Sequence, residues 1–536
     1  MIKKSLVFIG LLGFIALGLS PNNAGAFDKL TFGDQSLSVY GFLRNNTGYF
    51  LETQPYQLND DKLATERTWL RTYTDWKASD HFRFWADIQF AYEPEYGVEK
   101  GSVSKEDGKE YSEYDDINDV LREAYFELIP NKTTDIKIGR QIVIWGESLT
   151  ERVGDVIQPE DRRFTLAFSN LEDTRIPQWM IRGIQDINSI ASSFEWIVSP
   201  LLTGDEYRVN RVAGLYNLAN GQTGQRFAVY PEDRFLPPNS VGNPILFPQA
   251  PGVVVAPFSY DWSKLPDFVP GLGGTYVPNA LPVVHEEYPD TWTDMRYGFR
   301  TSTDMGGYLF GLIYWHTQEY DPIVKRGGLI PGVMIPTDAG PLPAREYTLV
   351  HPTEDIMGVY MSKQLPWPGV VRAEAIYSPN KPFNTFDQTD SDAIVKRDYI
   401  KYMVAYDLQG FLYFNWHKTA PFDITIEHVG EWIPNADNLQ YQALYATKQP
   451  EYVPRFSGRI STNWFYNRLA TDVVFSYYPW GNSGLVMPSA KWTPGWLNQN
   501  FSMELKYINI FGDNNYEGLG FLRTKDMVVL TTQINF

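Results

Sequence analysis

Segments of about ten residues with alternating apolar and polar side chains recur along almost the whole chain. In the clearest of them, residues 82–92 (FRFWADIQFAY), nearly every second side chain is apolar. This period of two predicts a β-strand. A tilted strand of about eleven residues is long enough to cross a bilayer, whereas strands of globular proteins usually have about five or six. The opposite face of this strand, which carries Arg83, Trp85 and Asp87, would then point into a water-filled lumen.

The connections between these segments alternate in length. Short turns such as residues 77–81 (KASDH) and 366–369 (PWPG) alternate with long connections such as residues 92–119 and 319–354. Outer-membrane barrels have this pattern, with short periplasmic turns and long outer loops. With both chain ends in the periplasm the strand number must be even. The sequence therefore predicts an all-β fold, a transmembrane antiparallel β-barrel of about 18 strands (16–18) in the outer membrane.

Residues 1–26 have the order of a secretory signal peptide. Lys3 and Lys4 precede an apolar run over residues 6–19, and the small residues 24–26 (AGA) follow. The run is short for a membrane anchor, so we expect cleavage before Phe27. The barrel would then comprise residues 27–536, which contain no apolar run long enough for a transmembrane helix.

The last segment, residues 526–536 (DMVVLTTQINF), alternates in the same way and ends on an aromatic residue. It resembles the C-terminal recognition strand of bacterial outer-membrane proteins, which implies outer-membrane lipid and the barrel-assembly machinery as partners. A strand that closes a barrel has no free edge, whereas a bare apolar edge in a soluble sheet invites aggregation. The last strand of a soluble sheet is the alternative. In a barrel, the lipid-facing residues of this assembly strand would be Val528, Leu530, Ile534 and Phe536.

The composition supports an exported barrel and limits the partners. The chain has no Cys, so a large core or a closed hydrogen-bonded ladder must replace disulfides. Aromatic residues make up 15% of the chain, which suits the aromatic girdles of a transmembrane barrel as well as a carbohydrate-binding protein. A formal net charge of −18 argues against nucleic acid as a partner.

Two neighbouring runs form a paired motif, residues 139–148 (GRQIVIWGES) and 155–161 (DVIQPED). Together with residues 121–128 (LREAYFEL) and the last strand, they resemble a family of Gram-negative outer-membrane proteins described as domain of unknown function 1302. In that family a strand ending in a GRQ-x-x-x-WGES-like run leads into a DVINP-x-D-like loop, and here Gln158 stands where Asn is usual. The resemblance implies a porin-like channel, often working beside inner-membrane exporters or in the metabolism of hydrophobic compounds.

Charged residues are concentrated at this motif. Arg140 lies among isoleucines and would be costly on a lipid face, so it either sits near an interface or is covered by a loop. One interpretation is a charged constriction that selects solutes. The other, equally open, is a salt-bridged loop anchored to the wall. The candidate constriction residues are Arg140, Trp145, Glu147, Asp155, Asp161, Arg162 and Arg163.

Two further features concern the lumen. Arg372 and Glu374 share a strand face and are predicted, like Arg83 and its neighbours, to point inward, although such pairs line any polar barrel interior. Residues 200–291 are rich in Pro and Gly and form a connection too long for a compact domain. We expect this stretch to fold into the mouth or lumen, with a solvated outer loop as the alternative.

The sequence does not point to an enzyme. Its six His have no metal-ligand spacing, and no G-x-S-x-G run or Gly-rich phosphate loop occurs. We therefore expect no catalytic residues, no metal and no cofactor. The predicted function is a channel or transport barrel for a small or hydrophobic solute, alone or with an inner-membrane transporter. The alternatives are a structural or surface-interaction barrel with a plugged lumen and, less favoured, a barrel-wall hydrolase.

Overall fold

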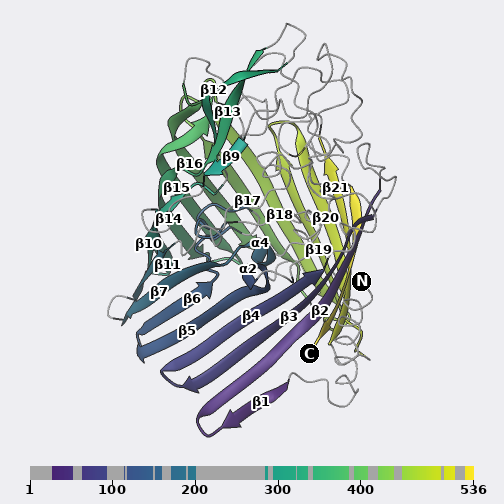
Figure 1. Ribbon diagram of the computed structural model, residues 1–536. Helices are drawn as coiled ribbons and strands as arrows, with labels where there is room; N and C mark the ends of the chain where they lie inside the picture. The colour runs from purple at the N-terminus through teal and green to yellow at the C-terminus, as the bar shows by residue number, and fades with distance from the viewer. Residues whose placement is uncertain are drawn as a thin grey trace.

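The computed structural model describes residues 27–51, 63–92, 114, 117–148, 151–159, 171–188, 191–200, 284–287, 294–320, 323–335, 342–385, 391–408, 420–439, 449–495, 500–512, 519 and 526–536. These residues form a closed antiparallel β-barrel, as predicted (Figure 1). Its wall consists of 18 strands, in ring order β2 (Gln35–Phe50), β3 (Leu63–Ser79), β4 (Phe82–Tyr92), β5 (Leu121–Asn131), β6 (Thr134–Gln141), β7 (Gln178–Ile187), β8 (Ser192–Ser199), β10 (Arg296–Met305), β11 (Tyr308–Gln318), β14 (Thr353–Gln364), β15 (Val370–Asn384), β16 (Ile394–Leu408), β17 (Asp423–Trp432), β18 (Tyr452–Trp464), β19 (Leu469–Tyr478), β20 (Ser483–Trp492), β21 (Phe501–Phe511) and β22 (Met527–Asn535).

The ring closes at the last strand. β22 pairs with β21 on one side and with β2 on the other. The backbone N–H of Phe536 donates to the carbonyl of Gly41 at 3.0 Å, and the N–H of Gly41 donates back at 2.9 Å. A short strand, β1 (Phe27–Phe32), pairs with the first residues of β2, next to the stretch that β22 covers. The ladder is therefore continuous around the whole ring.

The register of the ladder fixes which side chains face outward. The outward rows carry large exposed apolar side chains, among them Leu312, Val404, Ile426, Leu505 and Leu530. A surface of this kind is unfavourable in water but not in lipid, and a closed barrel satisfies its backbone hydrogen bonds within the membrane. This is the architecture of an outer-membrane protein. Among the described residues, no helix is both long and apolar enough to cross a membrane.

Each of the predicted alternating segments overlaps one wall strand, and several predicted boundaries differ from the observed ones by four residues or more. The alternation over residues 135–145 predicts one strand, but β6 ends at Gln141 and the last four of these residues leave the wall. The predicted alternation of connections also has two exceptions. β19 and β20 are joined at the long-loop end by the short turn of residues 479–482, and β16 and β17 are joined at the short-turn end by the longer connection of residues 409–422.

A second, three-stranded sheet lies at the long-loop end of the barrel (Figure 1). It consists of β9 (Val284–Glu287), β12 (Ile323–Ile335) and β13 (Leu342–Val350), none of which the sequence patterns predicted. β9 belongs to the long connection of residues 200–291, of which residues 201–283 and 288–291 lie outside the described part of the chain. The folding of that connection into the mouth or lumen therefore stays a prediction. So does the signal peptide, because residues 1–26 also lie outside it.

Candidate functional site

After β6 the chain leaves the barrel wall and enters the lumen. We call residues 142–148 and 151–159 the lumen segment. Four of its apolar side chains, those of Val143, Trp145, Val153 and Ile157, are almost completely buried. They pack on a band of lumen-facing apolar side chains that extends from β7 to β17: Met180, Ile197, Ile313, Trp315, Ile356, Ile376, Met403 and Val429. Because such a band is unfavourable against water, covering it with the lumen segment buries apolar surface on both partners.

Trp145 lies within this contact. Its ring meets that of Trp315 edge-on, with centroids 5.9 Å apart and an interplanar angle of 81°. Edge-to-face pairs of this kind are favourable beyond the area they bury. Gly154 makes room for the close approach, because a Cβ at this position would lie 2.9 Å from Oε2 of Glu374 and 3.3 Å from Cδ1 of Ile313.

The carboxylate of Glu374, on β15, ties two parts of the lumen segment to the wall. It accepts hydrogen bonds from the backbone N–H of Glu147 at 2.7 Å and from that of Gly154 at 3.2 Å. The hydroxyl of Ser148 donates to the fully buried carboxylate of Glu427 on β17 at 3.0 Å. Within the WGES run, Trp145 therefore packs on the apolar band, and the backbone of Glu147 and the hydroxyl of Ser148 bind carboxylates of the wall.

The lumen segment reaches the opposite side of the barrel. Glu151 forms an ion pair of 2.9 Å with Arg455 on β18 and accepts a hydrogen bond of 3.0 Å from the hydroxyl of Tyr478 on β19. β6 is fifth and β18 fourteenth in the ring of 18 strands counted from β2, so they lie nine places apart, directly opposite each other. The segment therefore crosses the lumen.

The two halves of the motif meet where the segment returns to its start. Asp155 accepts hydrogen bonds from two nitrogens of Arg175, Nε at 2.8 Å and Nη2 at 2.7 Å. Gln158 accepts from the backbone N–H of Val143 at 3.1 Å and donates to the carbonyl of Gln141 at 3.4 Å. A Cβ at Gly146 would lie 2.6 Å from the backbone nitrogen of Asp155, which explains a glycine at this position.

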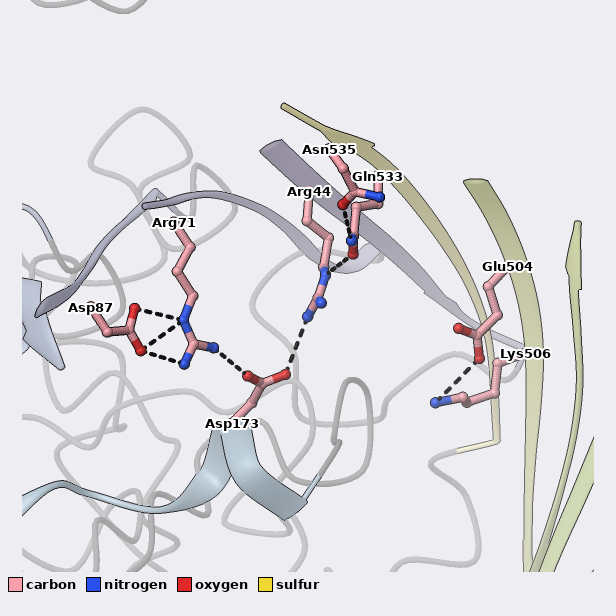
Figure 2. A network of polar contacts seen from close by, with 8 residues as sticks. All are labelled: Arg44, Arg71, Asp87, Asp173, Glu504, Lys506, Gln533 and Asn535. Carbon is pink, nitrogen blue, oxygen red and sulfur yellow. Dashed lines mark hydrogen bonds and ion pairs between the residues drawn. The ribbon is translucent and has the colours of Figure 1, made fainter. Parts of the chain in front are cut away.

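A second polar group lies on the lumen face of β2 and β3 (Figure 2). Arg44 and Arg71 both bind Asp173, which belongs to the short helix α4 (Leu171–Thr174) inside the ring (Figure 1). Arg71 is also held by the carboxylate of Asp87 on β4. The β6–β7 connection, which already contacts β7–β17 and reaches β18 and β19, is thereby also attached to β2 and β3.

Comparison with known proteins assigns the family. The model of the family described as "Protein of unknown function (DUF1302)" matches residues 59–536. The chain belongs to this family. The resemblance seen in the paired motif is therefore confirmed. No curated protein matches this chain.

Solved structures similar to this DUF1302 barrel are outer-membrane proteins. OccK8 (OprE) of Pseudomonas aeruginosa is 7% identical with a TM-score of 0.44, over 93% of this chain and 98% of that chain. OccAB3 of Acinetobacter baumannii is 8% identical with a TM-score of 0.43, over 93% and 99%. OmpF of Salmonella typhi, in complex with daunomycin, is 9% identical with a TM-score of 0.39, over 95% and 100%. Likeness at this level does not bear on function.

The predicted constriction residues fall into three groups. Trp145 and Asp155 are buried contacts between the DUF1302 motif and its surroundings, and Glu147 pairs with Arg300 of β10 at 3.1 Å. Arg140 belongs to the outward-facing row of β6, where it pairs with Ala124 and Trp179, and is only 3% exposed. The charged constriction and the anchored loop both stay predictions. Asp161, Arg162 and Arg163 lie outside the described residues.

The five predicted lumen-facing residues all lie in inward rows. The ion pairs of Arg83 with Asp75, of Asp87 with Arg71 and of Arg372 with Asp407 run between neighbouring strands, and Arg372 also reaches Glu427 on β17, the next strand but one. Glu374 holds the lumen segment, as described above. Trp85 packs near the aromatic rings of Tyr73 and Tyr40.

Several residues of the site were not predicted from the sequence. Asp173, Arg175 and Arg455 lie in stretches without a recognisable motif. Glu427 had a usable signal, because it occupies the inward row of a strand whose outward row includes Ile424, Ile426 and Trp432. In the described part of the chain, no group of three or more His, Asp or Glu is arranged to hold a metal ion.

We expect Asp155→Asn to loosen the lumen segment without opening the barrel. Both partners of the Asp155–Arg175 pair are nearly buried, and breaking a buried pair costs about 3–5 kcal/mol. Hydrogen exchange of the backbone amides of residues 142–159 should accelerate accordingly. Asp472→Asn is the matched control, because the guanidinium of its partner Arg459 is half exposed and such pairs contribute about 0–1 kcal/mol. Equal acceleration in both variants would contradict the anchoring role of Asp155.

Proposed function

We propose that this DUF1302 protein is an outer-membrane channel for a small solute. The observation that carries the proposal is that charged side chains of the inward rows remain accessible to solvent. The side chain of Arg459 on β18 is 52% exposed and that of Arg83 on β4 is 39% exposed. Charged groups in a barrel lumen stay exposed when the lumen contains water, and a water-filled lumen is what a channel requires.

The placement of the lumen segment supports a constricted channel. Its apolar side chains cover the apolar band of β7–β17. Charged side chains line the lumen faces of β2, β3, β4 and β21, and also those of β15, β16 and β17. The lumen is thus partly filled by packed protein and is otherwise polar. A solute passing through would meet charged side chains, so charge and hydrogen bonding would contribute to selection.

Conductance of the purified protein in planar bilayers tests the proposal. We expect stepwise, ion-conducting insertions from the wild type. Replacing residues 201–283 by a short Gly-Ser linker, which leaves β9 in place, should raise the conductance if that stretch narrows the mouth. Silence of both proteins, each shown to be folded by heat-modifiable migration, would refute the channel.

The second candidate is a structural or surface-interaction barrel with a closed lumen. It is favoured by the way in which the lumen segment crosses to β18 and β19 through Glu151. It predicts no conductance from either protein and binding of a partner through the long-loop end.

We further propose that the channel works beside an inner-membrane transporter, as the family resemblance suggests. Crosslinking in whole cells, followed by purification of the barrel, tests it. Recovery of an inner-membrane transporter would support the partnership. Its absence under conditions that recover the barrel-assembly machinery would contradict it.

A further inference from the structure

Two arginines on the lumen face are oriented by the wall toward the same point. On β3, Nε and Nη2 of Arg71 donate to the carboxylate of Asp87 at 2.9 and 2.6 Å. On β2, Nε of Arg44 donates to Oε1 of Gln533 at 2.8 Å, and Gln533 in turn donates to Asn535 at 2.7 Å. Each guanidinium is therefore fixed by residues of the wall, and in each the Nη1 nitrogen is left to point into the lumen (Figure 2).

These two Nη1 nitrogens hold a single carboxylate, that of Asp173. Arg71 donates to Oδ1 at 2.9 Å and Arg44 donates to Oδ2 at 3.2 Å, so each oxygen is bound by a different arginine. Asp173 does not belong to the wall, because it lies on the β6–β7 connection. Its side chain is 23% exposed, and those of Arg44 and Arg71 are 16% and 11% exposed. The contact is therefore accessible from the lumen.

We propose that Arg44 and Arg71 form a binding site for the carboxylate of a solute, and that Asp173 occupies this site until the solute displaces it. We call the two arginines the carboxylate clamp. This inference deepens the proposed channel function and rests on it, since it names the class of solute. Guanidinium groups are suited to the task because they present several N–H donors in a fixed plane and keep their charge.

Aromatic rings next to the carboxylate clamp indicate the body of the solute. The guanidinium carbon of Arg44 lies 4.5 Å from the ring centroid of Phe42 and 5.7 Å from that of Trp69. The guanidinium carbon of Arg71 lies 5.2 Å from the ring centroid of Tyr73, which is itself 5.1 Å from the ring of Tyr40. Phe42 and Trp69 are buried, whereas Tyr40 is exposed. A solute with a carboxylate on a flat apolar body could therefore place its charge on the arginines and its ring on Tyr40 and Tyr73. An aromatic carboxylate fits this description.

Lys506 on β21 provides a matched comparison. It is another lumen-facing cation in Figure 2, but its nearest acidic partner is Glu504 on its own strand, at 3.7 Å. Lys506 and Arg44 each contribute one positive charge to the lumen. Of these two residues, only Arg44 is oriented toward Asp173 by a neighbouring strand. Replacing each in turn therefore shows whether a carboxylate binds to this specific site or is attracted by the overall charge of the lumen.

Calorimetric titration of the detergent-solubilised, folded barrel with benzoate tests the inference. We expect Asp173→Asn to bind benzoate about tenfold more tightly than the wild type. In the wild type, only the fraction of molecules in which Asp173 has left the arginines can bind benzoate, and the apparent affinity falls with that fraction. In the Asp173→Asn background, Arg44→Gln should weaken binding about tenfold or more, and Lys506→Gln should leave it unchanged. Acetate and benzamide, which lack the ring or the charge, should bind more weakly than benzoate.

Two outcomes would overturn the inference: Asp173→Asn that binds benzoate no more tightly than the wild type, or an equal loss of binding in Arg44→Gln and Lys506→Gln. Heat-modifiable migration confirms that each variant is folded before titration. Because the titration needs no current, failure of the inference and failure of the channel are distinguishable. A barrel that conducts but does not bind benzoate refutes only the clamp, and one that binds benzoate but does not conduct refutes only the channel.

Discussion

Leu530→Arg is expected to reduce the amount of folded barrel in the outer membrane severalfold. Leu530 lies in the outward row of β22, between Thr47 and Leu505 on the neighbouring strands, and is 38% exposed on the barrel surface. A cation at mid-membrane on the lipid face costs about 2–4 kcal/mol. This is a large fraction of the stability of a typical protein. The fraction of heat-modifiable protein in outer-membrane preparations, and urea unfolding in vesicles, measure the effect.

Thr531→Arg is the control for this prediction. Thr531 is the next residue of the same strand but lies in the inward row, where it pairs with Asn46 and with Glu504. An arginine there would face a polar lumen and an acidic neighbour, so we expect little loss of assembly. If both variants lost folded barrel to the same extent, the assignment of the two rows of β22 would be wrong.

The alternation that identifies β22 also identified the other wall strands, because a period of two and a length set by the bilayer are local properties of the sequence. Gln141 marks the limit of this reasoning. Residues 142–145 continue the alternation of β6, yet they leave the wall. The cause is the apolar band on the inner side of β7–β17, to which Ile313 and Met403 contribute from separate strands. That band exists only when the strands are aligned, so no single segment reveals it.

The polar contacts of the site were less predictable still. The paired motif left two interpretations open, because its acidic residues could anchor a loop or face the pore. Their partners depend on the fold: Glu151 binds Arg455, 304 residues away, and Asp155 binds Arg175 at the other end of the β6–β7 connection. Arg44 and Asp173 are 129 residues apart, and nothing in either neighbourhood indicates the other. Pairings of this kind depend on strand order and on the path of the β6–β7 connection.

The largest effect on the lumen itself is expected from Trp145→Ala. Trp145 is fully buried between the lumen segment and the wall, and replacing such a residue by Ala costs about 3–5 kcal/mol. The wall strands keep their hydrogen-bonded ladder, so the loss should fall on the packing of the lumen segment. We expect the variant to remain heat-modifiable while residues 142–159 become sensitive to protease. In planar bilayers its conductance should fluctuate more than that of the wild type, because a detached segment moves within the lumen.

Two further variants separate packing from the mere loss of a tryptophan. Trp145→Phe should be much milder, because a ring still packs on Trp315. In addition, the indole N–H of Trp145 has no acceptor among the described residues, so its removal leaves no new polar group unsatisfied. Trp432→Ala removes an exposed tryptophan from the outward row and should leave both protease resistance and conductance unchanged. Wild-type protease resistance in Trp145→Ala would show that polar anchors such as Glu374 suffice to hold the segment, and that the apolar band contributes little to its placement.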